Sequence, residues 1–364
     1  MPQETPAYQP PRIAAAQIKL LERLCNASGV SGDEGDVRKI VLAEVRPSAD
    51  EVKVDALGNV LVTRHGKEPV ENGARLRVML AAHMDEIGMM ITNDEGEGIY
   101  RFDLVGGIDT RVLVGKAVYV GAERVPGVIG AKAIHLTTAE ERKNPISLDT
   151  LRIDVGPAKT KVQVGDRVVF ATPFTRQGSI LRGKALDDRI GVATLIQLLK
   201  NAPENIDLLL AFTVQEEIGA RGARVAAYTF KPDLAFAIDS TPAHDLPTWD
   251  EAENTQYNTR LGAGPAIYIA DSGTLSDPRL VRHLLQTAEV LHIPCQVRQP
   301  GGGGTDAGAI HKQLAGIPSV SVSIPGRHAH TPLLISRLED WQNTLALLHA
   351  ALVRMPTDLL AVER

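Results

Sequence analysis

Several apolar runs typical of buried strands end in histidine or carboxylate side chains or are followed by them. They include VMLAAH, LLLAFT, LAFAID and VSVSI. Side chains able to bind a metal ion end these runs, follow them or stand just before a predicted helix: His83, Asp85, Asp187, Asp188, Glu216, Glu217, Asp239, His328 and His330. Ligands of open α/β sheets bind beyond the carboxyl ends of the strands, so these side chains are expected to converge there.

A site of this composition would gather several negative charges. Their mutual repulsion raises pKa values unless cations share the site. Mixed imidazole and carboxylate ligation suits zinc, cobalt or manganese. A bridging carboxylate could hold two divalent ions about 3.5–4 Å apart, as in hydrolytic two-metal sites. The only cysteines, Cys25 and Cys295, indicate neither a disulfide framework nor a cysteine-based zinc site.

The adjacent glutamates Glu216 and Glu217 stand at the end of an apolar run. Neighbouring residues on a regular strand point to opposite faces, so both can serve one site only if the strand has already broken. The segment EEIGARG, with its two glycines, is expected to supply that break. One glutamate would then bind metal while the other acts as a general base. A glycosidase is the alternative for such a pair, with carboxyls about 5–5.5 Å apart, but it leaves the histidines without a role.

Composition restricts the class of protein. The 364 residues are 44% hydrophobic and 23% charged, with a formal net charge of −5. This charge argues against general binding of nucleic acid or of an anionic membrane surface. No apolar run approaches the ~20 residues that span a bilayer, and residues 1–12 lack the pattern of a signal peptide. A soluble, cytoplasmic protein is expected.

The elements that position these residues follow from hydrophobic periodicity. The spacing predicts a helix over Ile13–Leu24 and a second helix that is capped by Ser31 and ends at Val45. Residues 51–64 read as a hairpin around a Gly-Asn turn.

From Met89 to about Ser179 only short β runs separated by turn signals occur, which is typical of a small barrel or sandwich. Helices alternating with continuous apolar strands then resume and run to the end of the chain, which indicates an α/β core with helices on both faces. The predicted fold class is α/β: a three-layer αβα catalytic domain with a mixed sheet, residues 1–88 and 179–364, interrupted by a β domain of residues 89–178.

Six ordered motifs resemble the M42 metallopeptidases, the glutamyl and tetrahedral (TET) aminopeptidases. They are AAHMDEIG, GKALDDRIG, VQEEIGARGA, AIDST, GGGGTDAGAIH and GRHAHTP, and the likeness extends from about Ser28 to Pro332. The β segment falls where that family carries its dimerisation domain. The resemblance therefore implies homo-oligomers, with dimers assembling into a hollow tetrahedral dodecamer that admits short peptides.

The same resemblance assigns roles to individual residues. His83 and Asp239 would bind one metal ion, and Glu217 and His330 the other, with Asp187 bridging the two. Glu216 would be the general base and a water shared by the ions the nucleophile, while Asp85 would orient the His83 ring. The bond between Asp187 and Asp188 is often a cis peptide in this fold class.

Some positions leave alternatives open. The family usually has tyrosine where this chain has His328, which puts nearby substrate contacts in doubt, and His328 and Asp306 are candidate pocket residues. The glycines of GGGGTDAG could cradle an anion through backbone N–H groups or form a tight connection. Asp188 reads as a structural partner of Arg189 rather than a ligand.

The predicted activity is a two-metal aminopeptidase that removes N-terminal residues from short peptides, with two zinc or cobalt ions per subunit, or manganese. A metal-dependent deacylase or amidohydrolase on the same scaffold is the alternative, and dependence on a free amine separates the two. A non-enzymatic scaffold with a decayed site would lack a ligand, and none is missing.

Overall fold

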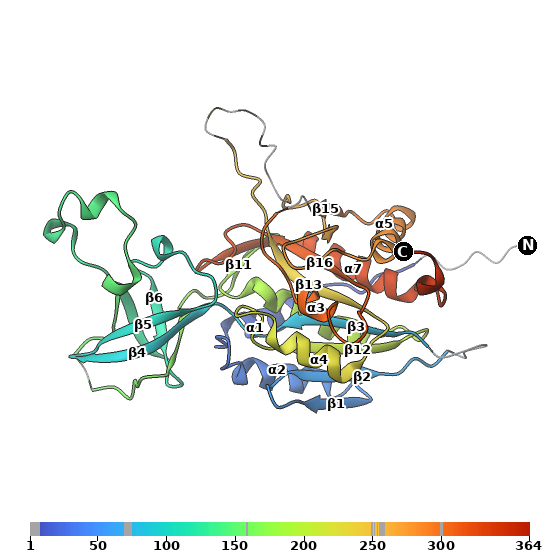
Figure 1. The fold of residues 1–364 in the computed structure, drawn as a ribbon, viewed down its shortest axis with the longest axis horizontal. Helices are drawn as coiled ribbons and strands as arrows, with labels where there is room; N and C mark the ends of the chain where they lie inside the picture. Colours follow the sequence, from blue (N-terminus) through green and yellow to red (C-terminus); the bar gives the residue numbers. More distant parts are fainter. Residues whose placement is uncertain are drawn as a thin grey trace, which may run out of the picture.

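The chain folds into a large α/β part with a β-barrel beside it (Figure 1). The computed structural model describes residues 8–68, 75–157, 159–248, 250, 252, 254, 259–298 and 301–364. Within these ranges no helix is long and apolar enough to cross a membrane.

An eight-stranded mixed sheet forms the centre of the α/β part, in the order β1-β2-β12-β3-β13-β16-β14-β15. Its strands are β1 (Glu51–Val54), β2 (Val60–Arg64), β3 (Arg77–His83), β12 (Asp207–Thr213), β13 (Leu234–Pro242), β14 (Ala266–Tyr268), β15 (Gln296–Arg298) and β16 (Ser319–Gly326). The central strands β12, β3, β13 and β16 are parallel to their neighbours in that group. Their carboxyl ends therefore meet at one edge of the sheet.

Helices cover both faces of the sheet, which confirms the predicted three-layer arrangement. One face packs against α1 (Ala15–Asn26), α2 (Gly35–Val45), α3 (Leu186–Lys200), α5 (Pro278–Leu291) and α7 (Leu338–Val353). The other packs against α4 (Arg221–Phe230) and α6 (Ala307–Ile310). Strand β3 serves both cores: Val78 and Leu80 point into the larger one, and Met79 and Ala81 into the smaller.

The inserted segment is a closed barrel with the strand order β4-β5-β8-β7-β6-β9. Of the two predicted architectures, barrel and sandwich, the structure has the barrel. Its strands are β4 (Gly88–Gly96), β5 (Ile99–Val105), β6 (Ala117–Val120), β7 (Val125–Gly130), β8 (Arg152–Asp154) and β9 (Arg167–Phe170). A small sheet of β10 (Thr175–Gln177), β11 (Ile180–Gly183) and β17 (Leu334–Arg337) follows it. The domain limits at residues 88/89 and 178/179 stay a prediction.

Both predicted N-terminal helices and the predicted hairpin are present, as α1, α2 and the antiparallel pair β1 and β2. The predicted cap by Ser31 is wrong. Helix α2 begins after Glu34 without a side-chain cap, and the Ser31 hydroxyl donates instead to Asp85 Oδ2 at 2.6 Å. The hydroxyl of Ser31 thus binds at the sheet edge to Asp85, a residue 54 positions away in the sequence.

Candidate metal centre

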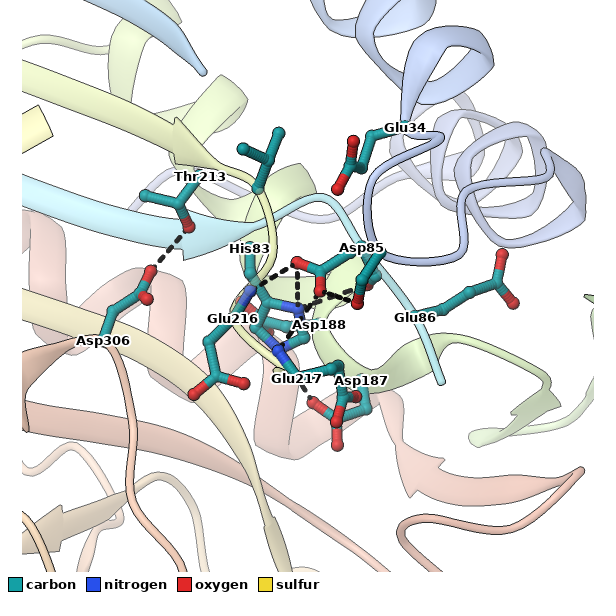
Figure 2. A network of polar contacts seen from close by, with 12 residues as sticks. Glu34, His83, Asp85, Glu86, Asp187, Asp188, Thr213, Glu216, Glu217 and Asp306 are labelled. Carbon is teal, nitrogen blue, oxygen red and sulfur yellow. Dashed lines mark hydrogen bonds and ion pairs between the residues drawn. The ribbon is translucent and has the colours of Figure 1, made fainter. Parts of the chain in front are cut away.

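The predicted metal-binding side chains converge at the carboxyl edge of the parallel strands. His83 is the last residue of β3, Asp239 lies near the end of β13, and Glu217 follows β12. Asp187 stands at the start of α3, and His330 lies in the loop after β16. Figure 2 shows His83 and the neighbouring carboxylates together at this edge.

The first group of candidate ligands consists of His83, Asp187 and Asp239. His83 Nε2 lies 3.4 Å from Asp187 Oδ1 and 3.7 Å from Asp239 Oδ1. Atoms that bind one zinc ion tetrahedrally at about 2.0–2.1 Å lie about 3.4 Å apart. The spacing of this group therefore suits one small divalent ion.

A second group, Asp187, Glu217 and His330, adjoins the first. His330 Nε2 lies 4.0 Å from Asp187 Oδ2 and 3.8 Å from Glu217 Oε2. The two oxygens of Asp187 thus face different groups, which is the arrangement of a bridging carboxylate. The bond between Asp187 and Asp188 is cis, as the resemblance implied.

The protonation chemistry of these carboxyls also fits a pair of cations. Burial, followed by the negative charge of Asp187, raises the pKa of Glu217 to about 8. Burial is likewise the main reason that the pKa of Asp239 is raised to about 7. Asp187 Oδ1 is buried and accepts no hydrogen bond of normal geometry from the described residues. Divalent ions would neutralise this excess of negative charge and occupy the open acceptor.

Asp85 contacts more of the site than His83, the one contact that was predicted for it. Its backbone oxygen lies 3.2 Å from His83 Nδ1, and its Oδ1 lies 3.5 Å from the same nitrogen. The carboxylate also accepts hydrogen bonds from the backbone N–H of Glu216 at 3.0 Å and from that of Glu217 at 3.2 Å. One buried carboxylate therefore holds a ligand-bearing strand end and the two glutamates together.

The regular strand ends before the glutamate pair, at a different place from the one predicted. Strand β12 ends at Thr213, and Gln215 takes a left-handed conformation with φ 57°. The glycines of EEIGARG come after this break, so they do not cause it. Because the backbone turns at Gln215, before the two glutamates, both Glu216 and Glu217 line the same cavity.

His330 is oriented by the inserted segment. Its Nδ1 lies 2.8 Å from the backbone oxygen of Gly107, in the connection that follows β5 of the barrel. Nε2 is thereby left to face Asp187 and Glu217. His328, the other histidine of this loop, is exposed and is not among the side chains that line the cavity. The grouping therefore favours His330 as the ligand of the pair.

Two further predictions have different outcomes. Asp306 is buried beside the site, where its Oδ2 accepts a hydrogen bond from Thr213 at 2.5 Å (Figure 2), but it does not line the cavity. The predicted pairing of Asp188 with Arg189 is wrong. Asp188 accepts from the backbone N–H of Gly191 at 3.0 Å, which anchors it within the first turns of α3.

Arg189 belongs instead to a buried ionic cluster that sequence reasoning missed. Its Nη2 lies 3.2 Å from Glu86 Oε1, and Lys184 Nζ lies 2.8 Å from each oxygen of the same carboxylate. Glu86 follows His83 by three positions, while Lys184 and Arg189 flank Asp187. The cluster therefore ties the segment after β3 to the start of α3, close in sequence to the candidate ligands His83 and Asp187.

A cavity of about 330 Å³ opens over the candidate ligands. Besides the predicted residues it is lined by Gly302, Gly303 and Gly304 of the glycine-rich segment and by residues that sequence reasoning did not assign to the site: Ser240, Pro242, His244, Tyr268, Arg298 and Ala329. Arg298 and Tyr268 belong to the edge strands β15 and β14. No motif marks these strands, so their approach to the centre follows only from the sheet order.

The fold is shared with solved aminopeptidases. The structure of an aminopeptidase from the archaeon Desulfurococcus kamchatkensis matches with a TM-score of 0.88 and 33% identity, covering 95% of this chain and 96% of that one. A Pyrococcus horikoshii TET1 peptidase, described as able to assemble into a tetrahedron or a large octahedral shell, matches with a TM-score of 0.80 and 34% identity, covering 93% and 100%.

The sequence defines the family. The model of the M42 glutamyl aminopeptidases matches residues 58–347, and the chain belongs to this family of metallo-aminopeptidases, which are peptide hydrolases.

Similar sequences include a protein of Acetivibrio thermocellus, 35% identical over 92% of this chain and 97% of its own. The glutamyl aminopeptidase of Lactococcus lactis is 30% identical, with 94% and 97% covered. The lysyl aminopeptidase of Pyrococcus furiosus is 31% identical, with 92% and 96% covered.

Proposed function

We propose that this protein is a two-metal aminopeptidase that removes N-terminal residues from short peptides. The observation that carries the proposal is the position of Asp187, whose two oxygens face two separate groups of ligands. His83 and Asp239 would hold one ion with Asp187, and Glu217 and His330 the other. The mixture of imidazole and carboxylate suits zinc or cobalt, and also manganese.

Two ions in these positions would polarise the scissile carbonyl and lower the pKa of the attacking water. Glu216 lines the same cavity without belonging to either group of ligands, so it is free to take a proton from that water and pass it to the leaving amine. Asp85 fixes the His83 ring and holds the backbone of Glu216. His328 and Asp306, the candidate pocket residues, belong to neither group of ligands and do not line the cavity, so the proposal gives them no role on the ions.

We keep residues 1–88 and 179–364 as the catalytic domain and residues 89–178 as the dimerisation domain. Dimers would build a tetrahedral dodecamer, a proposal supported by the related TET1 peptidase that can form a tetrahedron. A cytoplasmic location stays a prediction. The related enzymes named glutamyl and lysyl aminopeptidases act on different N-terminal residues, so membership of the family leaves the preference of this chain open.

The test is hydrolysis of a panel of aminoacyl p-nitroanilides by protein stripped with a chelator and then supplied with zinc, cobalt or manganese. Activity should return with metal, require a free amine, and fall by about 10²–10⁴ in the Glu216→Gln variant. That variant should still bind two ions per chain. Cleavage confined to N-acetylated substrates would favour a deacylase, and no cleavage of any free-amine substrate would refute the proposal.

A further inference from the structure

Arg298 brings a positive charge into the cavity of the candidate metal centre. It is the last residue of β15, it is only 3% exposed, and it lines the cavity. The metal ligands and the general base proposed above are all carboxylates or histidines. Arg298 therefore has no part in the chemistry described so far, although it shares the same enclosed space.

The guanidinium is held in one orientation by neutral groups. Its Nε donates to Thr241 Oγ1 at 3.2 Å, and its Nη2 donates to the Gly302 oxygen at 2.7 Å. Its central carbon lies 4.4 Å from the ring centre of Tyr268, the residue opposite it in the β14–β15 register. These contacts fix the position of the charge but do not neutralise it.

One edge of the guanidinium is left unpaired. Nη1 is buried and has no hydrogen-bond partner among the described residues, and in the same part of the chain no carboxylate forms an ion pair with Arg298. Arginine remains charged in proteins, and a buried charge without a partner is costly. An anion that enters the cavity would supply the missing partner, and a carboxylate matches the fork of the guanidinium best.

Arg298 and the candidate ligand Asp239 line one cavity and are linked through neighbouring positions of β13. Thr241, which holds Arg298, follows Asp239 by two positions on β13, so the two side chains lie on the same face of the strand, about 6–7 Å apart. A substrate whose amino group and first carbonyl lie at the metal centre would have its first side chain in the same cavity, beside the strand position that holds Arg298.

We propose that Arg298 binds the side-chain carboxylate of the N-terminal residue, so that the enzyme prefers peptides beginning with Glu or Asp. This inference rests on the proposed aminopeptidase function. An apolar first side chain would leave Nη1 unpaired, and a lysine or arginine would be repelled. Sites built around a buried polar partner reject substrates that lack it more strongly than apolar pockets reject a change of size.

The test compares kcat/KM for the p-nitroanilides of Glu, Gln, Leu and Lys. These substrates carry no α-carboxylate, so a preference for Glu over its near-isostere Gln must come from the side chain. We expect Glu to exceed Gln, Leu and Lys by about 100-fold or more. Arg298→Gln should lower the Glu value by about 100-fold and change the Leu value by less than about 3-fold, while Arg298→Lys should retain part of the preference.

Arg327→Gln is the matched control, because Arg327 pairs with Asp245 and does not line the cavity. Its ratio of Glu to Leu cleavage should equal that of the wild type. Calorimetric binding of L-glutamate against L-glutamine gives a second readout, and Arg298→Gln should abolish the difference between them. Melting curves of each variant report whether it folds. If Arg298→Gln does not fold, the order of kcat/KM values for the wild-type enzyme tests the proposal by itself.

Failure of this inference is distinct from failure of the proposed function. Cleavage of the Leu or Lys derivative without a preference for Glu overturns the role of Arg298 and leaves the aminopeptidase intact. Absence of cleavage of every free-amine substrate overturns both. If Arg298→Gln impaired cleavage of Leu-Gly but not of Leu-glycinamide, Arg298 would bind the α-carboxylate of a dipeptide, and the assignment to the side chain would be wrong.

Discussion

Asp85 illustrates how one buried carboxylate can set the geometry of the candidate metal centre without belonging to either group of candidate ligands. Its two oxygens accept from the backbone of Glu216 and Glu217 and from the Ser31 hydroxyl, and its Oδ1 lies beside the His83 ring. The two backbone N–H groups can only donate, and the Ser31 hydroxyl donates here as well. The carboxylate is therefore the one group that can accept from all of them at once.

Asp85→Asn should weaken metal binding by about 10–100-fold, because the amide nitrogen would face a donor that it cannot accept from. Competition with a chromogenic zinc chelator measures this change. Ser31→Ala is the control: it removes one hydrogen bond, worth about 0.5–1.5 kcal/mol of stability, and should leave the metal affinity within about 3-fold. An Asp85→Asn variant with wild-type affinity and activity would contradict the positioning role.

The candidate ligands could be predicted from sequence because each stands at a recognisable place, the end of an apolar run or the start of a helix. His83, Asp187 and Asp239 come together as expected. The contacts of Arg298 could not be predicted in this way. They depend on the register between β14 and β15 and on a carbonyl in the glycine-rich loop, and no local pattern encodes either.

At the scale of elements, the segment after β3 is tied to the start of α3 by the buried cluster of Glu86, Lys184 and Arg189. Asp187 lies between Lys184 and Arg189 in the sequence. The position of this proposed bridging carboxylate therefore depends on the ionic contact. Sequence reasoning paired Arg189 with its neighbour Asp188 instead. A local pairing is the simplest expectation from a sequence, whereas Glu86 lies 103 positions away.

Glu86→Gln should destabilise the fold by about 3–5 kcal/mol, since it leaves two buried cations without a carboxylate. The urea midpoint of unfolding, compared at equal oligomeric state, measures the loss. Glu44→Gln is the surface control, because Glu44 pairs with Arg23 and Lys200 near solvent and should cost less than about 1 kcal/mol. Equal losses in the two variants would mean that the cluster does not stabilise the junction.

At the scale of the whole molecule, the inserted barrel was predictable as a unit, since its short β runs differ from the alternation on either side. Its contact with the catalytic centre was not predictable. The backbone oxygen of Gly107, beyond the end of β5, lies 2.8 Å from His330 Nδ1, so the inserted segment fixes the orientation of a candidate ligand supplied by the loop after β16. The barrel is therefore coupled to the site, whatever it contributes to assembly.

Gly107→Ala tests this coupling. A Cβ at Gly107 would lie 3.3 Å from His330 Nδ1, so the ring would have to move and its Nε2 would change position relative to Asp187 and Glu217. We expect one of the two ions to bind about 10–100-fold more weakly while the other is retained. Metal content per chain after dialysis against graded chelator measures the split. Gly130→Ala provides the control within the barrel, because its Cβ would meet only the Arg152 oxygen at 3.8 Å. If both variants kept two ions with wild-type affinity, the barrel would contribute nothing to the centre. If both lost one, the effect would come from general disturbance of the barrel rather than from the contact with His330.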